Sequence, residues 1–290
     1  MDDQLLEPGW QARRVPVGDL SLHVVEAGPA DGPPIILLHG FPEFWWGWRK
    51  LIGPLATAGF RVIAPDLPGY NRSDRPAGVS AYRLDRLVGD VRGLIDTLGL
   101  GRVTLVGHDW GGIVAWGVAA MHADRLSRLV ILDAPHPEAW RHFMLRHPGQ
   151  ALRSAYVGWF QLPFAPEAML RIGRFAMLRA TMRNSARVGL FTEAELDAYA
   201  QAWSDPGALT AMLNYYRALA RPGQPRLGRI ETPTLILWGD RDSFLDNRLA
   251  AASAGHCASA QVRVIDGATH WLHLEEPTRV VEELRAFARS

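Results

Sequence analysis

The decapeptide Val103-Thr104-Leu105-Val106-Gly107-His108-Asp109-Trp110-Gly111-Gly112 decides the fold class, because it joins an apolar run to a helix-length segment at residues 113–122. A nucleophile between two glycines, in a strand-turn-helix context, is the pattern of a nucleophile elbow. The glycines allow a sharp turn and close packing of the helix, so the side chain between them is raised at the helix N-terminus. The pattern predicts that Asp109 is catalytic. The alternative is an aspartate that only caps the following helix.

Further apolar runs of strand length alternate with helical patterns on both sides of this segment. The runs cover residues 34–38, 61–64, 129–132, 234–238 and 262–265, and helical patterns include residues 82–98 and 277–287. Such alternation predicts an α/β fold with a mainly parallel sheet and helices on both of its faces. Residues 20–26 and the segment before them predict an antiparallel hairpin at the start.

The strand-helix rhythm stops between residues 135 and 221, where helix signals are frequent and no good strand occurs. Thr192 and Glu195 form a capping box, and Asp205-Pro206 predicts an N-cap followed by proline at the first helical position. We therefore expect a core in two parts, residues 1–134 and 222–290, with residues 135–221 inserted as a helical lid.

Composition excludes several classes of protein. The 290 residues are 48% hydrophobic, which suffices for a large core, and the formal net charge is +1. That total gives no reason to expect binding to nucleic acid or to an anionic membrane. No apolar window resembles a transmembrane span, and the first residues lack a secretory signal pattern, so a cytoplasmic location is expected. Cys257 is the only cysteine, which excludes an internal disulfide and a cysteine-rich metal site.

An aspartate in place of the usual serine selects the chemistry. A serine that opened an epoxide would become an ether, which water does not readily cleave. A carboxylate becomes an ester, whose carbonyl carbon can be attacked by activated water. Asp109 therefore indicates substitution at an sp³ carbon, as in epoxides or alkyl halides.

Ester hydrolysis needs a base and a group that orients it. His270 follows the last strand-like run, at the edge of the sheet where sites of open α/β sheets lie. Asp242 follows the run before it and fits the order nucleophile, acid, histidine. Asp133, at the end of a neighbouring strand, is the competing orienting acid.

The segment His39-Gly40-Phe41-Pro42 predicts a tight turn after the run at residues 34–38. Such a turn can aim the Phe41 backbone N–H at the nucleophile. Together with the Trp110 N–H it would form an oxyanion hole. The alternative is a simple turn with His39 buried in the core.

Together these segments resemble the epoxide hydrolases of the α/β-hydrolase superfamily, over residues 9–287. The matching segments are His39-Gly40-Phe41-Pro42-Glu43-Phe44-Trp45-Trp46-Gly47-Trp48-Arg49, Asp66-Leu67-Pro68-Gly69-Tyr70, Gly107-His108-Asp109-Trp110-Gly111-Gly112, Asp133-Ala134-Pro135-His136-Pro137 and Gly267-Ala268-Thr269-His270-Trp271. The resemblance implies an α/β-hydrolase fold with a mostly parallel eight-stranded sheet. It also implies conversion of a small apolar epoxide and water to a vicinal diol, without metal or organic cofactor.

The resemblance further implies two lid tyrosines that bind the epoxide oxygen. One precedes a Phe-Gln-x-Pro segment by four residues, which points to Tyr156, and the other lies in an Asn-aromatic-Tyr-Arg pattern, which points to Tyr216. Helical spacing supports Tyr216 independently, because it shares one apolar face with Leu209, Met212 and Leu213. The alternative is that both are ordinary aromatic residues of the lid core. We expect the substrate pocket to be lined by His39, Pro42, Trp110, Phe160 and Trp271.

Two other functions stay open from the sequence. Haloalkane and haloacid dehalogenases use the same aspartyl ester, but haloalkane dehalogenases usually have asparagine where Phe41 stands, and haloacid relatives have arginine where Trp110 stands. A ligand sensor without catalysis, on a hydrolase scaffold, is the alternative of another class. Either a monomer or a homodimer is compatible with the sequence.

Overall fold

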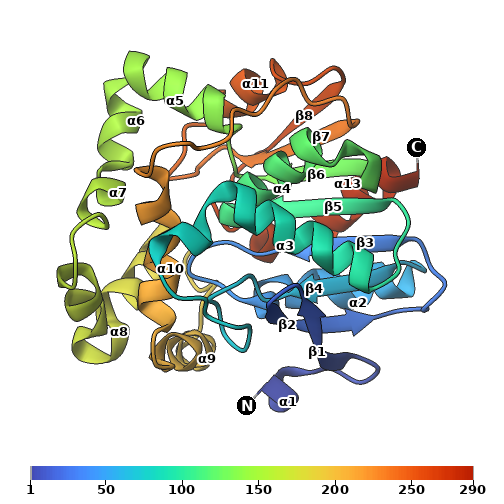
Figure 1. Ribbon diagram of the computed structural model, residues 1–290, viewed down its shortest axis with the longest axis horizontal. Coiled ribbons are helices and arrows are strands. Elements are labelled where there is room, and N and C mark those ends of the chain that lie inside the picture. Colours follow the sequence, from blue (N-terminus) through green and yellow to red (C-terminus); the bar gives the residue numbers. More distant parts are fainter. Residues whose placement is uncertain (1, 290) are drawn as a thin grey trace.

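A single eight-stranded sheet forms the centre of the computed structural model, which describes residues 2–289 (Figure 1). The strands are β1 (Gln11–Val17), β2 (Leu20–Ala27), β3 (Pro34–Leu38), β4 (Arg61–Pro65), β5 (Val103–His108), β6 (Leu126–Leu132), β7 (Thr234–Gly239) and β8 (Ala260–Ile265). Their order is β1-β2-β4-β3-β5-β6-β7-β8. β2 is antiparallel to β1 and β4, and every later pair is parallel. The predicted hairpin and mostly parallel eight-stranded sheet are confirmed.

Helices cover both faces of this sheet. They are α1 (Asp2–Leu5), α2 (Arg49–Thr57), α3 (Leu84–Thr97), α4 (Trp110–Met121), α5 (Pro137–Arg146), α6 (Pro148–Arg153), α7 (Ala155–Trp159), α8 (Ala165–Ser185), α9 (Glu193–Ser204), α10 (Ala208–Leu219), α11 (Arg248–Ala254), α12 (Leu272–Glu275) and α13 (Pro277–Arg289), with short 3₁₀ helices at Trp45–Trp48, Val79–Tyr82 and Ala123–Arg125. α3 and α4 pack together on one face, and α2 and α13 on the other. Among residues 2–289, none of the helices combines the length and the apolar character needed to cross a bilayer.

The central strand β5 shows why the carboxyl edge of the sheet carries the site. All six of its residues are buried, because the strand lies between β3 and β6 and under helices on both faces. A fully buried parallel strand requires a continuous apolar run, as the sequence has. Asp109 follows β5 and Asp133 follows β6, so the parallel register brings both carboxylates to the same edge.

Between β6 and β7 the described chain contains only helices, α5–α10, which we call the helical insert. It lies beyond the carboxyl ends of the central strands, on the left of Figure 1. The capping box predicted at its helix α9 is present: the Thr192 hydroxyl accepts from the Glu195 N–H, and the Glu195 carboxylate accepts from the Thr192 N–H. α8 is interrupted at residues 172–175, where the backbone leaves helical geometry.

The helix start predicted at Asp205-Pro206 is wrong. α9 ends at Ser204, and α10 begins at Ala208 with Gly207 as its N-cap residue. Two features explain the difference. The Asp205 carboxylate pairs with Arg75 at 2.9 Å instead of capping a helix, and Gly207, at φ +82°, allows the chain to turn between the two helices.

Candidate active site

The elbow between β5 and α4 holds Asp109 in a backbone conformation that few residues adopt, with φ 49° and ψ −120°. The flanking glycines make the turn feasible. A Cβ on Gly107 would lie 2.4 Å from the Gly111 carbonyl oxygen, and a Cβ on Gly111 would lie 2.1 Å from the Leu38 carbonyl oxygen. The strand and the helix can therefore approach this closely only with glycine at both positions.

The two carboxylate oxygens of Asp109 have different surroundings. Oδ1 accepts a hydrogen bond of 2.7 Å from the Phe41 N–H. Oδ2 lies 3.8 Å from Nε2 of His270, and 18% of the Asp109 side chain is exposed. One oxygen is thus held by the backbone while the other faces both the histidine and the cavity. Trp110, whose N–H is the second predicted oxyanion donor, is the first residue of α4; this role of its N–H stays a prediction.

His270 is oriented by Asp242 in the structure. Nδ1 of His270 lies 2.8 Å from Oδ2 of Asp242, and Oδ1 of Asp242 accepts from the N–H groups of Phe244 and Leu245 at 2.7 and 3.0 Å. The short loop after β7 therefore fixes the carboxylate, and the carboxylate fixes the ring.

Asp133, the competing acid, has another partner. Its Oδ1 accepts from the Gly239 N–H at 2.9 Å, and its Oδ2 has no hydrogen-bond partner within the described chain. Burial, reinforced by the charge of Asp242, raises the pKa of Asp133 well above its usual value. Its backbone partner and its raised pKa distinguish Asp133 from Asp242, which is the carboxylate that holds the histidine.

The electrostatics of His270 follow from three neighbouring carboxylates. Burial on its own would lower the pKa of His270, but Asp242, Asp109 and Asp133 outweigh burial and raise this pKa to about 10. The imidazole is therefore cationic at neutral pH in the resting site. Loss of the Asp109 charge would remove one of the three contributions that raise the pKa of His270.

Two tyrosines of the insert face the nucleophile across the cavity. The rings of Tyr156 and Tyr216 meet edge-to-face, with centroids 5.8 Å apart. Burial and the charge of Asp109 raise the pKa of Tyr156, and burial, Tyr156 and Asp109 raise that of Tyr216. Both phenols are therefore protonated donors at neutral pH. The neighbouring Tyr215 differs, because its hydroxyl donates to the Pro68 carbonyl oxygen at 2.8 Å.

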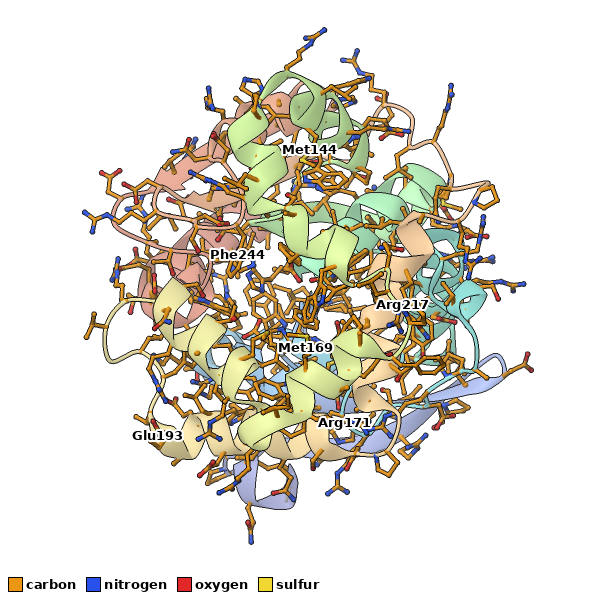
Figure 2. All side chains as sticks on the ribbon, turned by 90° about the vertical axis from the view of Figure 1, so that its left-hand side faces the viewer. Met144, Met169, Arg171, Glu193, Arg217 and Phe244 are labelled. Atoms are coloured by element: carbon orange, nitrogen blue, oxygen red, sulfur yellow. The ribbon has the colours of Figure 1, made fainter. Side chains whose placement is uncertain are left out.

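The cavity over Asp109 has a volume of about 570 Å³ and mainly apolar walls. Four of the predicted pocket residues line it: Pro42, Trp110, Phe160 and Trp271. Phe244, which is labelled in Figure 2, also lines it. Its ring packs edge-to-face on His270, with ring centroids 5.1 Å apart. Phe244 escaped the sequence analysis, although its position two residues after Asp242 was an available signal.

The prediction that His39 lines the pocket is wrong. His39 is fully buried and is absent from the cavity wall. Its Nε2 accepts from the Leu67 N–H at 2.9 Å, and its Nδ1 lies 3.1 Å from the Gly40 carbonyl oxygen. The His39 ring therefore stabilises the turn that positions the Phe41 N–H, and its role in the core is structural.

A buried polar cluster behind His270 was also missed by the sequence analysis. Glu43 lies between His108 and His273, at 3.1 and 3.2 Å from a ring nitrogen of each. Burial alone would raise the pKa of Glu43, but the two imidazoles lower it. Nε2 of His108 lies 2.9 Å from the His270 carbonyl oxygen, so the cluster supports the backbone of the base. One ligand-type atom from each of its three residues lies within 4.8 Å of the others, as is also true of His108, Asp133 and His270.

Comparisons with known proteins agree with this geometry. A family model described as "alpha/beta hydrolase fold" matches residues 33–277. "Epoxide hydrolase 2" of Caenorhabditis elegans is 41% identical over 93% of this chain and 78% of that protein. "AB hydrolase superfamily protein YfhM" of Bacillus subtilis (strain 168) is 43% identical over 94% of this chain and 96% of that protein.

Among solved structures, an epoxide hydrolase from Bacillus megaterium in complex with an inhibitor superposes with a TM-score of 0.86 at 28% identity, over 96% of this chain and 100% of that chain. The chain belongs to the epoxide hydrolase family of the α/β-hydrolase superfamily. Asp109, His270, Tyr156 and Tyr216 all border one cavity.

Proposed function

We propose that this protein opens an apolar epoxide with water through a covalent ester on Asp109. One observation carries the proposal: Oδ1 of Asp109 is held by the Phe41 N–H at 2.7 Å, while Oδ2 faces the cavity and lies 3.8 Å from Nε2 of His270. A carboxylate held in this way has one oxygen free to attack carbon and one oxygen already bonded to a donor that can stabilise a later oxyanion.

In the first step, Oδ2 of Asp109 forms a bond to one ring carbon, and the bond from that carbon to the epoxide oxygen breaks. The negative charge moves to the epoxide oxygen. Tyr156 and Tyr216 border the cavity and donate hydrogen bonds to this oxygen, and one phenol supplies its proton. Because the charge exists only after the ring begins to open, these bonds are stronger in the transition state than in the bound substrate.

In the second step, His270 takes a proton from water, and the resulting hydroxide attacks Cγ of Asp109. The oxyanion forms on Oδ1, where the Phe41 N–H and the Trp110 N–H hold it. The bond between Cγ and Oδ2 then breaks, and the diol leaves with the oxygen that Asp109 supplied. The departing alkoxide takes the proton from His270, and the proton left on the new Asp109 carboxyl passes to the tyrosinate formed in the first step, so the Asp109 carboxylate and the phenol are regenerated.

The charges of the site support this order of steps. The cationic His270 stabilises the Asp109 carboxylate before attack. When the ester forms, the Asp109 charge disappears, and the pKa of His270 falls from its value of about 10 in the resting enzyme. The neutral imidazole needed as a base therefore becomes more abundant after the alkylation step.

The apolar cavity supports an apolar epoxide and water as the reactants, and the scheme requires no metal or organic cofactor. The helical insert would serve as a lid that contributes both tyrosines. Phenols that donate to an alkoxide differ from the ring and indole N–H donors that hold a departing halide. An assay of halide release, run beside the assay of diol formation, separates the two activities.

The test is to trap the ester. His270→Gln should allow alkylation and block hydrolysis, so intact mass spectrometry after incubation with styrene oxide should show an adduct that peptide mapping places on Asp109. Asp109→Asn is the matched control and should give no adduct. A single turnover of excess wild-type enzyme in heavy-oxygen water should yield diol without solvent oxygen at first; immediate incorporation of solvent oxygen would exclude the ester mechanism.

A further inference from the structure

Large apolar side chains are exposed mainly on the helical insert. Of eleven exposed large apolar side chains among the described residues, nine belong to residues 135–221. Val188, Phe164 and Leu145 are the most exposed of them, at 105%, 84% and 83%. Apolar exposure of this extent on one element marks a surface that is covered by a partner.

Exposed arginines lie among these apolar side chains. We define the outer insert face by the apolar residues Leu145, Leu152, Leu162, Phe164, Met169, Ile172 and Met177 and the basic residues Arg141, Arg146, Arg153, Arg171 and Arg174, all exposed. Figure 2 looks onto this side of the molecule, where α5–α8 lie nearest the viewer and α8 presents Met169 and Arg171. In Figure 1 the same helices form the outer left edge, so the face belongs to one side of the molecule.

The two acidic residues of this stretch are largely buried, and Glu138 lies 3.8 Å from Arg141 at the edge of the face. Between residues 137 and 177 the acids are Glu138 and Glu167, and their side chains are only 13% and 12% exposed. Glu138 accepts from the Leu227 N–H at 2.8 Å, and Glu167 pairs with Arg217 at 2.7 Å. The outer insert face is therefore basic, although the whole chain carries only +1.

The next exposed acidic residues along the chain lie on α9, which borders the outer insert face. Glu193 and Asp197 pair with Arg179, and Glu193 also pairs with Arg183. These pairs neutralise the end of α8 and leave α5, α6, α7 and the first half of α8 without an exposed acid. Arg174 lies 3.9 Å from Asp197, the longest of these ion pairs.

We propose that the outer insert face docks on an anionic lipid surface. Leucine, isoleucine, methionine and phenylalanine side chains enter the boundary between headgroups and acyl chains, and the arginines bind lipid phosphates. A second copy of this chain fits less well, because a two-fold contact would place the arginines of one copy against those of the other. A nucleic acid would match the charge but leave seven apolar side chains without a partner.

The position of the cavity agrees with this partner. Arg141 and Met177 belong to the outer insert face and also line the cavity above Asp109. Docking therefore brings the cavity entrance next to lipid, where apolar epoxides accumulate. Binding itself does not depend on turnover, so it can be measured even if the proposed reaction were wrong.

The test is flotation of the purified protein with vesicles of phosphatidylcholine alone or of an equal mixture with phosphatidylglycerol. The wild-type protein should float with the mixed vesicles at low salt and be released only in part as salt rises, because salt screens the arginines and not the apolar contacts. Each basic residue near an anionic surface strengthens binding about fivefold, so Arg146→Gln/Arg171→Gln should weaken binding about 25-fold. Phe164→Ser/Ile172→Ser should abolish the binding that persists at high salt.

The matched control is Val264→Ser/Arg229→Gln, which removes an exposed apolar side chain and an exposed arginine outside the face. It should bind vesicles as the wild type does, and circular dichroism should show unchanged melting for all three variants. Absence of wild-type protein from the mixed vesicles at low salt would overturn the proposal, as would equal weakening by the control. So would a dimer in sedimentation velocity that Phe164→Ser/Ile172→Ser dissociates, because the occupant would then be a second copy.

Discussion

Gly40→Ala tests how closely the turn at residues 39–42 approaches the Asp109 side chain. A Cβ on Gly40 would lie 2.4 Å from Cβ, 2.5 Å from Oδ1 and 2.9 Å from Cγ of Asp109, where ordinary contacts are 3.4–4 Å. The Asp109 side chain must therefore move by about 1 Å, and a displacement of this size costs about 10²-fold in rate. The movement also breaks the hydrogen bond from the Phe41 N–H, and a bond to a charged group contributes about 1.5–3 kcal/mol, or roughly 10- to 10²-fold. We expect kcat/KM for diol formation to fall by about 10³- to 10⁴-fold.

The assay is steady-state diol formation, combined with the rate of adduct formation in a His270→Gln background. The nearest clash, with Cβ of Asp109, can be relieved only by a shift of the backbone at the turn or the elbow, so the melting temperature should fall as well. Gly158→Ala is the control: no heavy atom lies within 4 Å of its added Cβ, so activity should stay within about twofold of wild type. Wild-type kcat/KM in Gly40→Ala would refute the assigned positions of the turn and the nucleophile.

Three further predictions concern the phenols, the orienting acid and a histidine at the start of the insert. Tyr156→Phe and Tyr216→Phe should each slow ester formation about 10- to 10²-fold and leave ester hydrolysis nearly unchanged in stopped-flow single turnovers; equal slowing of both steps would contradict their role as donors to the epoxide oxygen. Asp242→Asn removes the principal carboxylate that raises the pKa of His270, so ester hydrolysis should become slower and its pH profile should move to lower pH; an unmoved profile would contradict the pairing. Burial and His256 lower the pKa of His136 from 6.5 to about 3 in the folded protein. Below pH 6.5 the unfolded chain therefore binds a proton at His136 that the folded chain does not bind. The folded protein consequently loses stability as the pH falls from 6.5 towards 3. His136→Asn should therefore flatten the decline of the urea midpoint below pH 6.5, and an equally steep decline in the variant would refute this.

The parts of the site that the sequence predicts well are those with local signals. The elbow combines a buried strand, two spaced glycines and a helix within twenty residues, so Asp109 can be identified from spacing alone. His270 and Asp242 follow strand ends, and parallel strands bring such ends to a common edge. Their pairing at 2.8 Å was therefore within reach of the sequence, although the choice between Asp242 and Asp133 required the loop geometry.

The remaining features depend on contacts between distant segments. Glu43 contacts His108 and His273 across 65 and 230 positions of the chain, and nothing in the local sequence of any one of them indicates the other two. The Asp205-Pro206 signal is local and was overridden by an ion pair with Arg75, which is 130 positions away. Local capping preference is worth about 1 kcal/mol, so a tertiary ion pair and a glycine turn are enough to displace it.

Net charge also fails to reveal features that depend on how the chain is folded. A total of +1 predicts no anionic partner, but the fold distributes the charges unevenly. Glu138 and Glu167 turn inward to bond Leu227 and Arg217, and the neighbouring arginines stay at the surface. Only the directions of side chains, which composition does not contain, reveal the basic outer insert face.

The backbone of the site is strained where the chemistry requires it. Asp109 and Asp133 both have positive φ, at 49° and 42°, and with a ψ of −120° Asp109 also lies outside the left-handed region that aspartate and asparagine adopt most readily. Each is held there by a hydrogen bond that extends the parallel ladder past the strand end: the Asp109 N–H donates to Leu132 O at 3.3 Å, and the Asp133 N–H donates to Leu237 O at 3.1 Å. Strain of this kind costs about 1–3 kcal/mol for each residue and persists only where the surrounding structure determines the conformation. The buried central strands meet that requirement, because their carboxyl ends can shift only if the register of the sheet shifts with them. The register of β5, β6 and β7 therefore holds the backbones of Asp109 and Asp133 in these conformations.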